Sequence, residues 1–297
     1  MKTIKQRISY AVMALITIGF AACTQNEDMT PTLKGQEINV TFSVGGLQTR
    51  VNTLGAGNRW ENDDQINVLQ IYGDESTNTG KYQYIEENGL YHWEPIVRLR
   101  WEKVGRCELI AWYPSDMTNF PIYNLHTDQS DETQLKAADF INGCWYDVPK
   151  DYVEIPMKHR MSLVTIVYHV GTADYPDMDI SEPQVYSKNN SVRFFGAPDH
   201  GQLVMGTPSG NPDWVKACKH DDGMFSAIVI PGSYKAGEIF VKFKIGDQNF
   251  HAKMMSNTEF QEGHRYTYKL DVGKDKVELT RISVDNMTGW TNEDELK

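Results

Sequence analysis

Several features typical of enzymes are missing from this chain of 297 residues. It contains no H-E-x-x-H zinc motif, no G-x-S-x-G nucleophile motif, no phosphate-binding loop and no G-x-G-x-x-G after a strand. Its eight histidines are scattered, and His159 and His169 stand too far apart along the chain for local metal chelation. We therefore predict a non-enzymatic protein with no catalytic residues, no cofactor and no metal site.

Basic residues are outnumbered, because 29 lysines and arginines face 40 aspartates and glutamates and the formal net charge is −11. A polyanion such as nucleic acid would be repelled overall, although this balance leaves room for a local basic patch. Hydrophobic residues make up 40% of the chain and charged residues 23%, which is an ordinary globular composition. A fibrous, disordered or polytopic membrane protein is thereby excluded.

Long apolar runs are also missing, except at the N-terminus. There a basic start precedes an apolar run over residues 11–20, which has signal-peptide length and is too short for a stable membrane anchor. The run ends in Phe20-Ala21-Ala22-Cys23, which resembles a bacterial lipobox. We predict a lipoprotein signal peptide over residues 1–22, lipidation of Cys23 and a flexible tether over residues 23–36. A conventional signal peptide is the alternative.

Cysteine is scarce, with four residues in the whole chain. If Cys23 carries lipid, an odd number remains, and none of the spacings forms a C-x-x-C or zinc-type pair. One disulfide among Cys107, Cys144 and Cys218 could form after export, but the sequence does not choose the pair. Buried free cysteines in strands are the preferred interpretation.

The rest of the chain has the pattern of β-strands almost throughout. Residues 38–44 alternate apolar and polar side chains, which is typical of a half-buried strand. Residues 107–113 form a nearly continuous apolar run, which predicts a strand covered on both faces. Residues 161–170 carry apolar side chains on both parities and predict a central strand. In contrast, residues 115–139 are polar and irregular, and we expect a long surface loop there.

Short strands with frequent turns, arranged in two halves, predict an all-β fold of two tandem antiparallel β-sandwich domains. A segment rich in Asp, Pro and Gly begins at Gly171 and marks the expected domain boundary. The N-terminal sandwich should therefore cover residues 37–172 and the C-terminal sandwich residues 173–297.

The apolar pattern changes phase near the C-terminus, within residues 277–290. Two apolar residues there have odd sequence numbers and two have even numbers, namely Val277, Leu279, Ile282 and Val284. One regular strand cannot send all four to the same face, because side chains alternate with a period of two. We predict a β-bulge or a break near Thr280-Arg281.

Several short motifs follow one another in this order. The first strand leads to Gln48-Thr49-Arg50, and Trp60 opens the run Trp60-Glu61-Asn62-Asp63-Asp64-Gln65-Ile66-Asn67-Val68. Further motifs lie at residues 111–114, 138–141, 157–164, 228–232, 260–270 and 282–290. Together, and behind a lipobox, they resemble the fimbrillin-like proteins of type V pili over almost all of the mature chain. The family's usual form of the tryptophan motif is Trp-x-x-Gly-Asp-x-Ile-x-Val, so Asp63 replaces its glycine.

This resemblance implies a lipoprotein precursor of two transthyretin-like sandwiches that matures into a pilus subunit. It also implies that an arginine-specific protease cuts after a residue placed like Arg50, so that the mature chain begins at Val51 and the first strand leaves with the lipid. Arg59 lies in the same loop, and anchor and some tip members of the family stay uncut. The expected localisation is the cell outer membrane, lipid-anchored and surface-exposed, or the fimbrium.

Loss of the first strand would uncover a groove and a row of unpaired backbone groups. Four apolar side chains would leave the sandwich, which corresponds to roughly 6–12 kcal/mol of lost burial; they are Ile38, Val40, Phe42 and Val44. A strand from the next subunit could restore both the apolar burial and the backbone hydrogen bonds. The donor candidate is the segment 276–297, with Val277, Leu279, Ile282 and Val284 at its apolar positions. Head-to-tail repetition of this contact gives an open filament.

The predicted function is therefore a fimbrial subunit that serves cell adhesion. Its expected partners are other pilus subunits, the outer membrane through the lipid on Cys23, and host or bacterial surface ligands, but not nucleic acid. The alternatives are an uncleaved pilus anchor and a surface glycan-binding lipoprotein. Seven tryptophans and fifteen tyrosines could line a sugar-binding face, although most such residues pack inside sandwich cores. The sequence does not distinguish a stalk, tip or anchor role.

Overall fold

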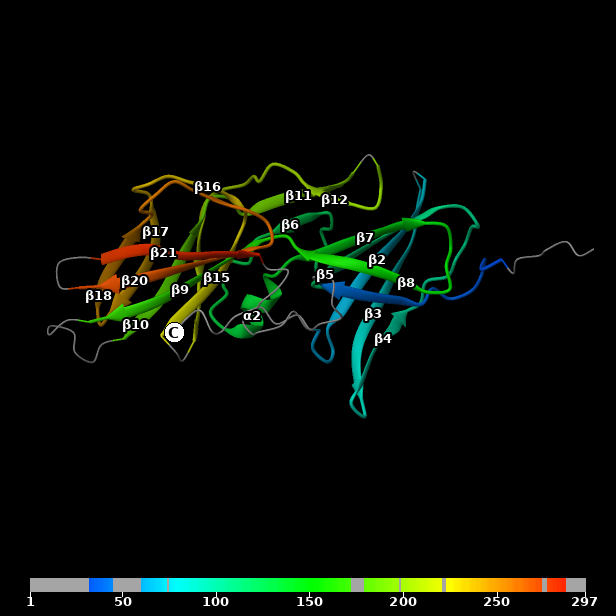
Figure 1. The fold of residues 1–297 in the computed structure, drawn as a ribbon, viewed down its shortest axis with the longest axis horizontal. Helices are drawn as coiled ribbons and strands as arrows, with labels where there is room; N and C mark the ends of the chain where they lie inside the picture. The colour runs from blue at the N-terminus through cyan, green and yellow to red at the C-terminus, as the bar shows by residue number, and fades with distance from the viewer. Residues whose placement is uncertain are drawn as a thin grey trace, which may run out of the picture. The chain divides into compact units, whose positions relative to one another are not determined.

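Strands make up nearly all of the regular structure (Figure 1). The computed structural model describes residues 32–44, 60–73, 75–171, 179–197, 199–220, 223–273 and 277–286. Within these ranges a single short helix, α2 (Glu132–Ala137), accompanies the strands. The all-β prediction is confirmed.

The first half of the chain forms a seven-stranded sheet in the order β1-β8-β7-β5-β2-β3-β4. β5, near its middle, is buried along its whole length, as its continuous apolar run predicts. β1 and β4 are the two edges of this sheet, yet they also contact each other, so the sheet curls until its edges meet. The strands are β1 (Val40–Val44), β2 (Gln65–Tyr72), β3 (Glu75–Glu87), β4 (Leu90–Val97), β5 (Cys107–Tyr113), β7 (Ile141–Asp147) and β8 (Val153–His159).

The second half forms two main sheets, of orders β14-β15-β9-β20-β21 and β13-β10-β17-β18. Contacts of β10 and β13 with β15, and of β18 with β21, place these sheets face to face around a shared core. Their strands are β9 (Ser162–Val170), β10 (Ile180–Ser187), β13 (Asp213–Lys216), β14 (Cys218–His220), β15 (Met224–Val229), β17 (Ile239–Ile245), β18 (Gln248–Lys253), β20 (His264–Val272) and β21 (Val277–Asn286).

Two smaller sheets complete the architecture. One has the order β12-β11-β6, with β6 (Ile122–Asn124), β11 (Ser191–Gly196) and β12 (Leu203–Met205), and it therefore joins segments from both halves of the chain. The other pairs β16 (Gly232–Tyr234) with β19 (Thr258–Phe260).

The change of sheet occurs earlier than the boundary expected at residues 172/173. β9 precedes that boundary, but it hydrogen-bonds to β15 and β20 of the second half. The chain therefore leaves the seven-stranded sheet between His159 and Ser162. The apolar residues on both parities of β9 correctly predict a central strand, but they carry no information on which sheet the strand joins.

Two strand pairs are parallel, which the antiparallel expectation did not include. β1 runs parallel to β8, and β9 runs parallel to β20. Parallel neighbours need a long connection, and here each pair joins strands that are far apart in the sequence.

The segment 115–139 is not simply a surface loop, contrary to expectation. It contains β6 and α2, and Tyr123, Gln129 and Leu135 within it are buried. The amide of Gln129 bonds both backbone groups of Ile228, with Nε2 donating to the carbonyl at 2.9 Å and Oε1 accepting from N–H at 2.7 Å. A buried polar side chain that pairs with a strand end leaves no apolar pattern in the sequence.

All three cysteines of the described region are free and buried, as the preferred interpretation holds. Burial raises the pKa of Cys144 to about 12 and the pKa of Cys107 and Cys218 to about 11. Because the thiolate is the reactive form, these thiols should be inert at neutral pH while the protein is folded.

Candidate functional site

The predicted site residues fall into three groups, of which one cannot be placed. Cys23, Arg50 and Val51 lie outside the described residues, so lipidation and cleavage stay predictions. The other two groups are the apolar residues of the first strand and those of the C-terminal segment.

β1 is buried along its whole length. The four apolar candidate residues of β1 and the residues just before it expose 6% or less of their surface, namely Ile38, Val40, Phe42 and Val44. Thr41 and Ser43, on the other parity, are buried as well. The alternating pattern predicted a half-buried strand, but both faces of β1 are covered, so the strand belongs to the core.

The backbone of residues 35–44 (Figure 1, blue) includes β1, which forms one edge of the curled sheet. β1 pairs in parallel with β8, with Val40 opposite Val153. Just upstream, the N–H of Ile38 donates to the carbonyl of Leu99 at 3.0 Å, so the segment also bonds to the chain that follows β4. Glu37 forms ion pairs with Arg98 and Arg100 at the same end. This segment therefore bridges β8 and the chain that follows β4.

Two aromatic side chains hold the carbonyls of this segment. Trp60 Nε1 donates to the carbonyl of Phe42 at 2.9 Å, and the hydroxyl of Tyr82 donates to that of Ile38 at 3.4 Å. Burial raises the pKa of Tyr82 to about 12, so its hydroxyl remains a donor at neutral pH. The Phe42 ring packs edge-on, with its centroid 5.7 Å from Tyr82 and 4.7 Å from Trp93.

The turn after Trp60 explains the unusual residue in the tryptophan motif. Asp63 has a φ of 72°, in the left-handed region where glycine is unstrained and aspartate is one of the better-tolerated alternatives. Asp64, which follows it, accepts a hydrogen bond from the N–H of Glu61 at 2.7 Å and pairs with Lys136 of α2 at 2.7 Å. These contacts fix the turn that presents the Trp60 indole to β1.

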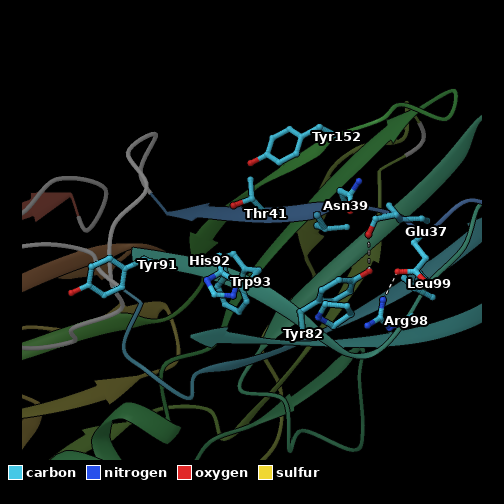
Figure 2. A pocket seen from close by; sticks show the side chains of 13 residues that line it. Glu37, Asn39, Thr41, Tyr82, Tyr91, His92, Trp93, Arg98, Leu99 and Tyr152 are labelled. Atoms are coloured by element: carbon cyan, nitrogen blue, oxygen red, sulfur yellow. Dashed lines mark hydrogen bonds and ion pairs between the residues drawn. The ribbon is translucent and has the colours of Figure 1, made fainter. Parts of the chain in front are cut away.

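A hollow of about 260 Å³ lies beside β1, between this strand and β4 (Figure 2). Asn39 and Thr41 line it from the β1 side, whereas Tyr82, His92 and Trp93 line it from the β3–β4 hairpin. In the view of Figure 2 the first two and the last three lie on opposite sides of the opening. The hollow shows that β4 does not cover the outer edge of β1 completely.

β21, the donor candidate, lies at the edge of the five-stranded sheet. It pairs antiparallel with β20, and the register shifts where Arg281 and Ser283 face consecutive residues of β20. Ile282 is thus the extra residue of a bulge, next to the position predicted from the phase change. The predicted bulge is confirmed.

The burial of β21 is uneven. Leu279 exposes 1% of its surface and Val277 is half-buried, whereas Val284 exposes 45%. The side chain of Ile282 and residues 287–297 lie outside the described part of the chain. Within one molecule the two candidate sets are not brought together, because β1 and β21 belong to different sheets.

One buried polar cluster was not predicted. His159 Nδ1 lies 3.0 Å from Asp139 Oδ1, and both side chains are almost fully buried. The neighbouring Arg160 donates through Nη2 to the carbonyl of Leu203 at 3.0 Å and lies over the Phe194 ring. Asp139 and His159 belong to two of the sequence motifs, at residues 138–141 and 157–164. These motifs were the available signal in the sequence that the two residues matter. The cluster ties together the place where the chain passes from β8 to β9.

Neither a metal centre nor a spanning helix is found in the part of the chain that the structure describes. No three His, Cys, Asp or Glu side chains there are grouped closely enough to hold a metal ion. No helix among the same residues combines the length and apolar character needed to cross a membrane.

Comparison with known proteins gives consistent matches. A family model described as fimbrillin-like matches residues 49–290. A curated Bacteroides uniformis protein, named "putative fimbrium subunit Fim1C", is 22% identical over 293 residues and 93% of each chain is covered.

Two crystal structures, both described as of a "putative cell adhesion protein", share the fold. The one from Bacteroides uniformis has a TM-score of 0.61 at 17% identity, with 84% of this chain and 97% of that chain covered. The one from Bacteroides ovatus has a TM-score of 0.61 at 16% identity, with 88% and 99% covered.

Proposed function

The chain belongs to the fimbrillin-like family, and from this premise we propose that it is an adhesive fimbrial subunit that is exported as a lipoprotein and assembles by strand exchange. Its place is the bacterial surface, first on the outer membrane through lipid on Cys23 and then in the fimbrium. Its partners are other subunits of the same fibre. It acts through binding and assembly, without catalysis.

The observation that carries this proposal is the complete burial of β1 at the edge of its sheet. Among the described residues, the groups that hold β1 and the adjacent Ile38 include the edge of β8, the segment after β4, and the Trp60 and Tyr82 donors, all of which come later in the chain. They bind backbone carbonyls and N–H groups, which every strand possesses. A strand from another molecule could therefore use the same bonds, as in β-strand addition.

The extent of the family match supports a cut near Arg50. The matched region begins at residue 49, so it leaves out β1 and everything before it. Cleavage after Arg50 would separate nearly all of the matched region from the lipidated fragment. The empty site would lose roughly 6–12 kcal/mol of apolar burial, which gives a strong driving force for refilling.

β21 has the properties expected of a donor. It is an edge strand with a bulge and a half-exposed side chain, so its release from β20 costs less than the release of a central strand. In the β1 site of the next subunit its apolar residues would regain full burial. Because donor and acceptor surfaces differ, the contact is heterologous and repeats into an open fibre.

The test is the N-terminus of the protein in fibres shed from the cell surface. We expect it to begin at Val51, and we expect Arg50→Ala to leave Cys23 in place and to abolish fibre formation. Arg59→Ala is the matched control, because it removes an arginine from the same loop and should leave assembly unchanged. Fibres built from chains that still begin at Cys23 would contradict the stalk role and would assign an anchor role instead.

A further inference from the structure

The outer face of the four-stranded sheet collects lysines from three of its strands. The strand register aligns Lys216, Gln184, Lys242 and His251 in one row across β13, β10, β17 and β18. Lys244 and Asn249 lie opposite each other in a neighbouring row, and Lys253 follows His251 on the same face. We call this surface the lysine face; it comprises Gln184, Tyr186, Trp214, Lys216, Lys242, Lys244, Asn249, His251 and Lys253.

The charge of the lysine face is opposite to that of the chain. The whole protein carries a formal charge of −11, whereas the face holds four lysines. Two of them have carboxylate partners, since Lys216 pairs with Asp128 at 2.9 Å and Lys244 with Glu182 at 2.7 Å. Among the residues that the structure describes, no ion pair is formed by Lys242 or Lys253. The face therefore presents unpaired positive charge to solvent.

A hollow of about 330 Å³ opens on this face. Its polar lining consists of Gln184, Lys242, Lys244, Asn249, His251 and Glu182, whose carboxylate pairs with Lys244, and its apolar lining of Ile239, Phe243 and Phe250. The volume lies at the small end of the ~300–1,000 Å³ range of small-ligand sites. Ammonium groups offer only donors, whereas the two amides both donate and accept. Such a lining suits a ligand that combines negative charge with hydroxyl groups.

Aromatic side chains extend the face beside this hollow. Tyr186 and Trp214 lie opposite each other on β10 and β13, with ring centroids 5.0 Å apart. Lys242 Nζ lies 3.9 Å from the centre of the Trp214 ring, so its side chain reaches across β10. An amphipathic ring next to a cation can contact the apolar face of a sugar ring while the cation binds the sugar's acidic group.

We propose that the lysine face binds an anionic polysaccharide, one bearing carboxylate or sulfate groups, and that it is an adhesion surface of the subunit. This proposal rests on the adhesive role proposed above and locates it on the second half of the chain. Charge complementarity with the two lysines that form no ion pair, and the amides and aromatic rings beside them, select the ligand. A docked protein is disfavoured, because the cores of protein–protein interfaces are depleted in lysine.

Dextran sulfate and uncharged dextran form a matched pair of probes for the purified mature protein. We expect dextran sulfate to bind, dextran not to bind, and the affinity for dextran sulfate to fall as salt is raised. The double variant Lys242→Gln/Lys253→Gln should weaken binding at least 10-fold. The control Lys158→Gln/Lys235→Gln removes two exposed lysines outside the face and should stay within twofold of the parent.

Three results would overturn the proposal. They are no binding of dextran sulfate, an equal loss in both double variants, and equally tight, face-dependent binding of polyglutamate, which would identify a general site for acidic polypeptides. Trp214→Ala tests the aromatic contact separately from charge. It should weaken binding of dextran sulfate severalfold although the net charge of the protein is unchanged. Fibre assembly by Lys242→Gln/Lys253→Gln should be normal, so failure of polysaccharide binding and failure of strand exchange are distinguishable.

Discussion

β1 and β21 are both edge strands, yet they are held in different ways. β1 is buried on both faces and receives bonds from β8 and from Trp60, while Ile38 just before it bonds to the chain after β4 and to Tyr82. Among the described strands β21 pairs only with β20; it also contains a bulge and leaves Val284 45% exposed. The position of a strand in a sheet therefore does not reveal how much the fold depends on it.

This difference bears directly on exchange between molecules. The site of β1 offers more complete burial than the present position of β21, although β21 pairs with β20 over more positions than β1 pairs with β8. A β21 strand that entered an empty β1 site would therefore gain apolar burial. A strand that moved from the β1 site to the position of β21 would lose burial. An assembly built on this asymmetry should proceed in one direction once β1 has left.

The largest single-residue effect should come from the centre of β1. Phe42→Ala removes a ring that is 1% exposed and packs on Tyr82 and Trp93. We expect the free energy of unfolding of the uncut protein to fall by about 3–5 kcal/mol. Urea denaturation followed by circular dichroism measures it. A loss below about 1 kcal/mol would show that β1 is not part of the core.

β21 should respond less, and only at its buried residue. Leu279→Ala leaves a cavity under an edge strand, where neighbours can relax, so we expect a loss of about 2–3 kcal/mol by the same measurement. A loss larger than that of Phe42→Ala would reverse the comparison and would make β21 an unsuitable donor.

Alkaline pH should weaken both strands through the tyrosines beneath them. Burial raises the pKa of Tyr82, under β1, and of Tyr268, opposite β21, to about 12, whereas both ionise near 10 when unfolded. Because the pKa is raised in the folded state, the full contribution of each neutral tyrosine to the free energy of unfolding is present below pH 10. This contribution is lost as the pH rises toward 12. Each tyrosine contributes at most about 1.4 kcal/mol per pH unit in this window.

Release of β1 should separate these two tyrosines. Without β1 the pKa of Tyr82 should move toward 10, because burial is the main cause of its raised pKa. The pKa of Tyr268 should stay near 12. Tyrosinate absorbance titrations of the protein with and without β1 measure this change, and Tyr82→Phe identifies the signal. An unchanged Tyr82 titration would mean that β1 does not shield it.

The smallest effect on stability should occur at the exposed end of β21. Val284→Thr should change the free energy of unfolding by less than about 0.5 kcal/mol, since the side chain is half in solvent. The same variant should slow fibre growth, because the residue becomes buried in the acceptor subunit. Equal growth rates for Val284→Thr and the parent chain would place the donor contacts elsewhere in 276–297.

Local patterns predicted local structure well in this protein. The apolar run of β5 predicted a strand buried on both faces, and the phase change after Leu279 predicted a bulge or break near Thr280-Arg281, which the structure places at the neighbouring Ile282. Both inferences depend only on side-chain alternation within one strand. The period of two likewise assigned the apolar residues of 38–44 to the buried face of a strand.

Long-range pairing could not be predicted in the same way. The pattern of β9 shows that both its faces are covered, but not that its neighbours are β15 and β20. Burial of Thr41 and Ser43 depends on the curl that brings β4 to β1. The Asp139–His159 pair and the buried Gln129 use polar residues, for which the sequence pattern suggests solvent. These features come from tertiary packing.

The central claim is that another molecule's C-terminal segment can replace β1, and displacement of β1 tests it most directly. The protein is cut after Arg50 in vitro, with a fluorophore on the tether of the 23–50 fragment, and an excess of a peptide covering residues 277–297 is added. We predict release of the labelled fragment by this peptide and no release by a peptide with aspartate in place of Leu279 and Ile282. Equal retention of the fragment with both peptides would contradict the account.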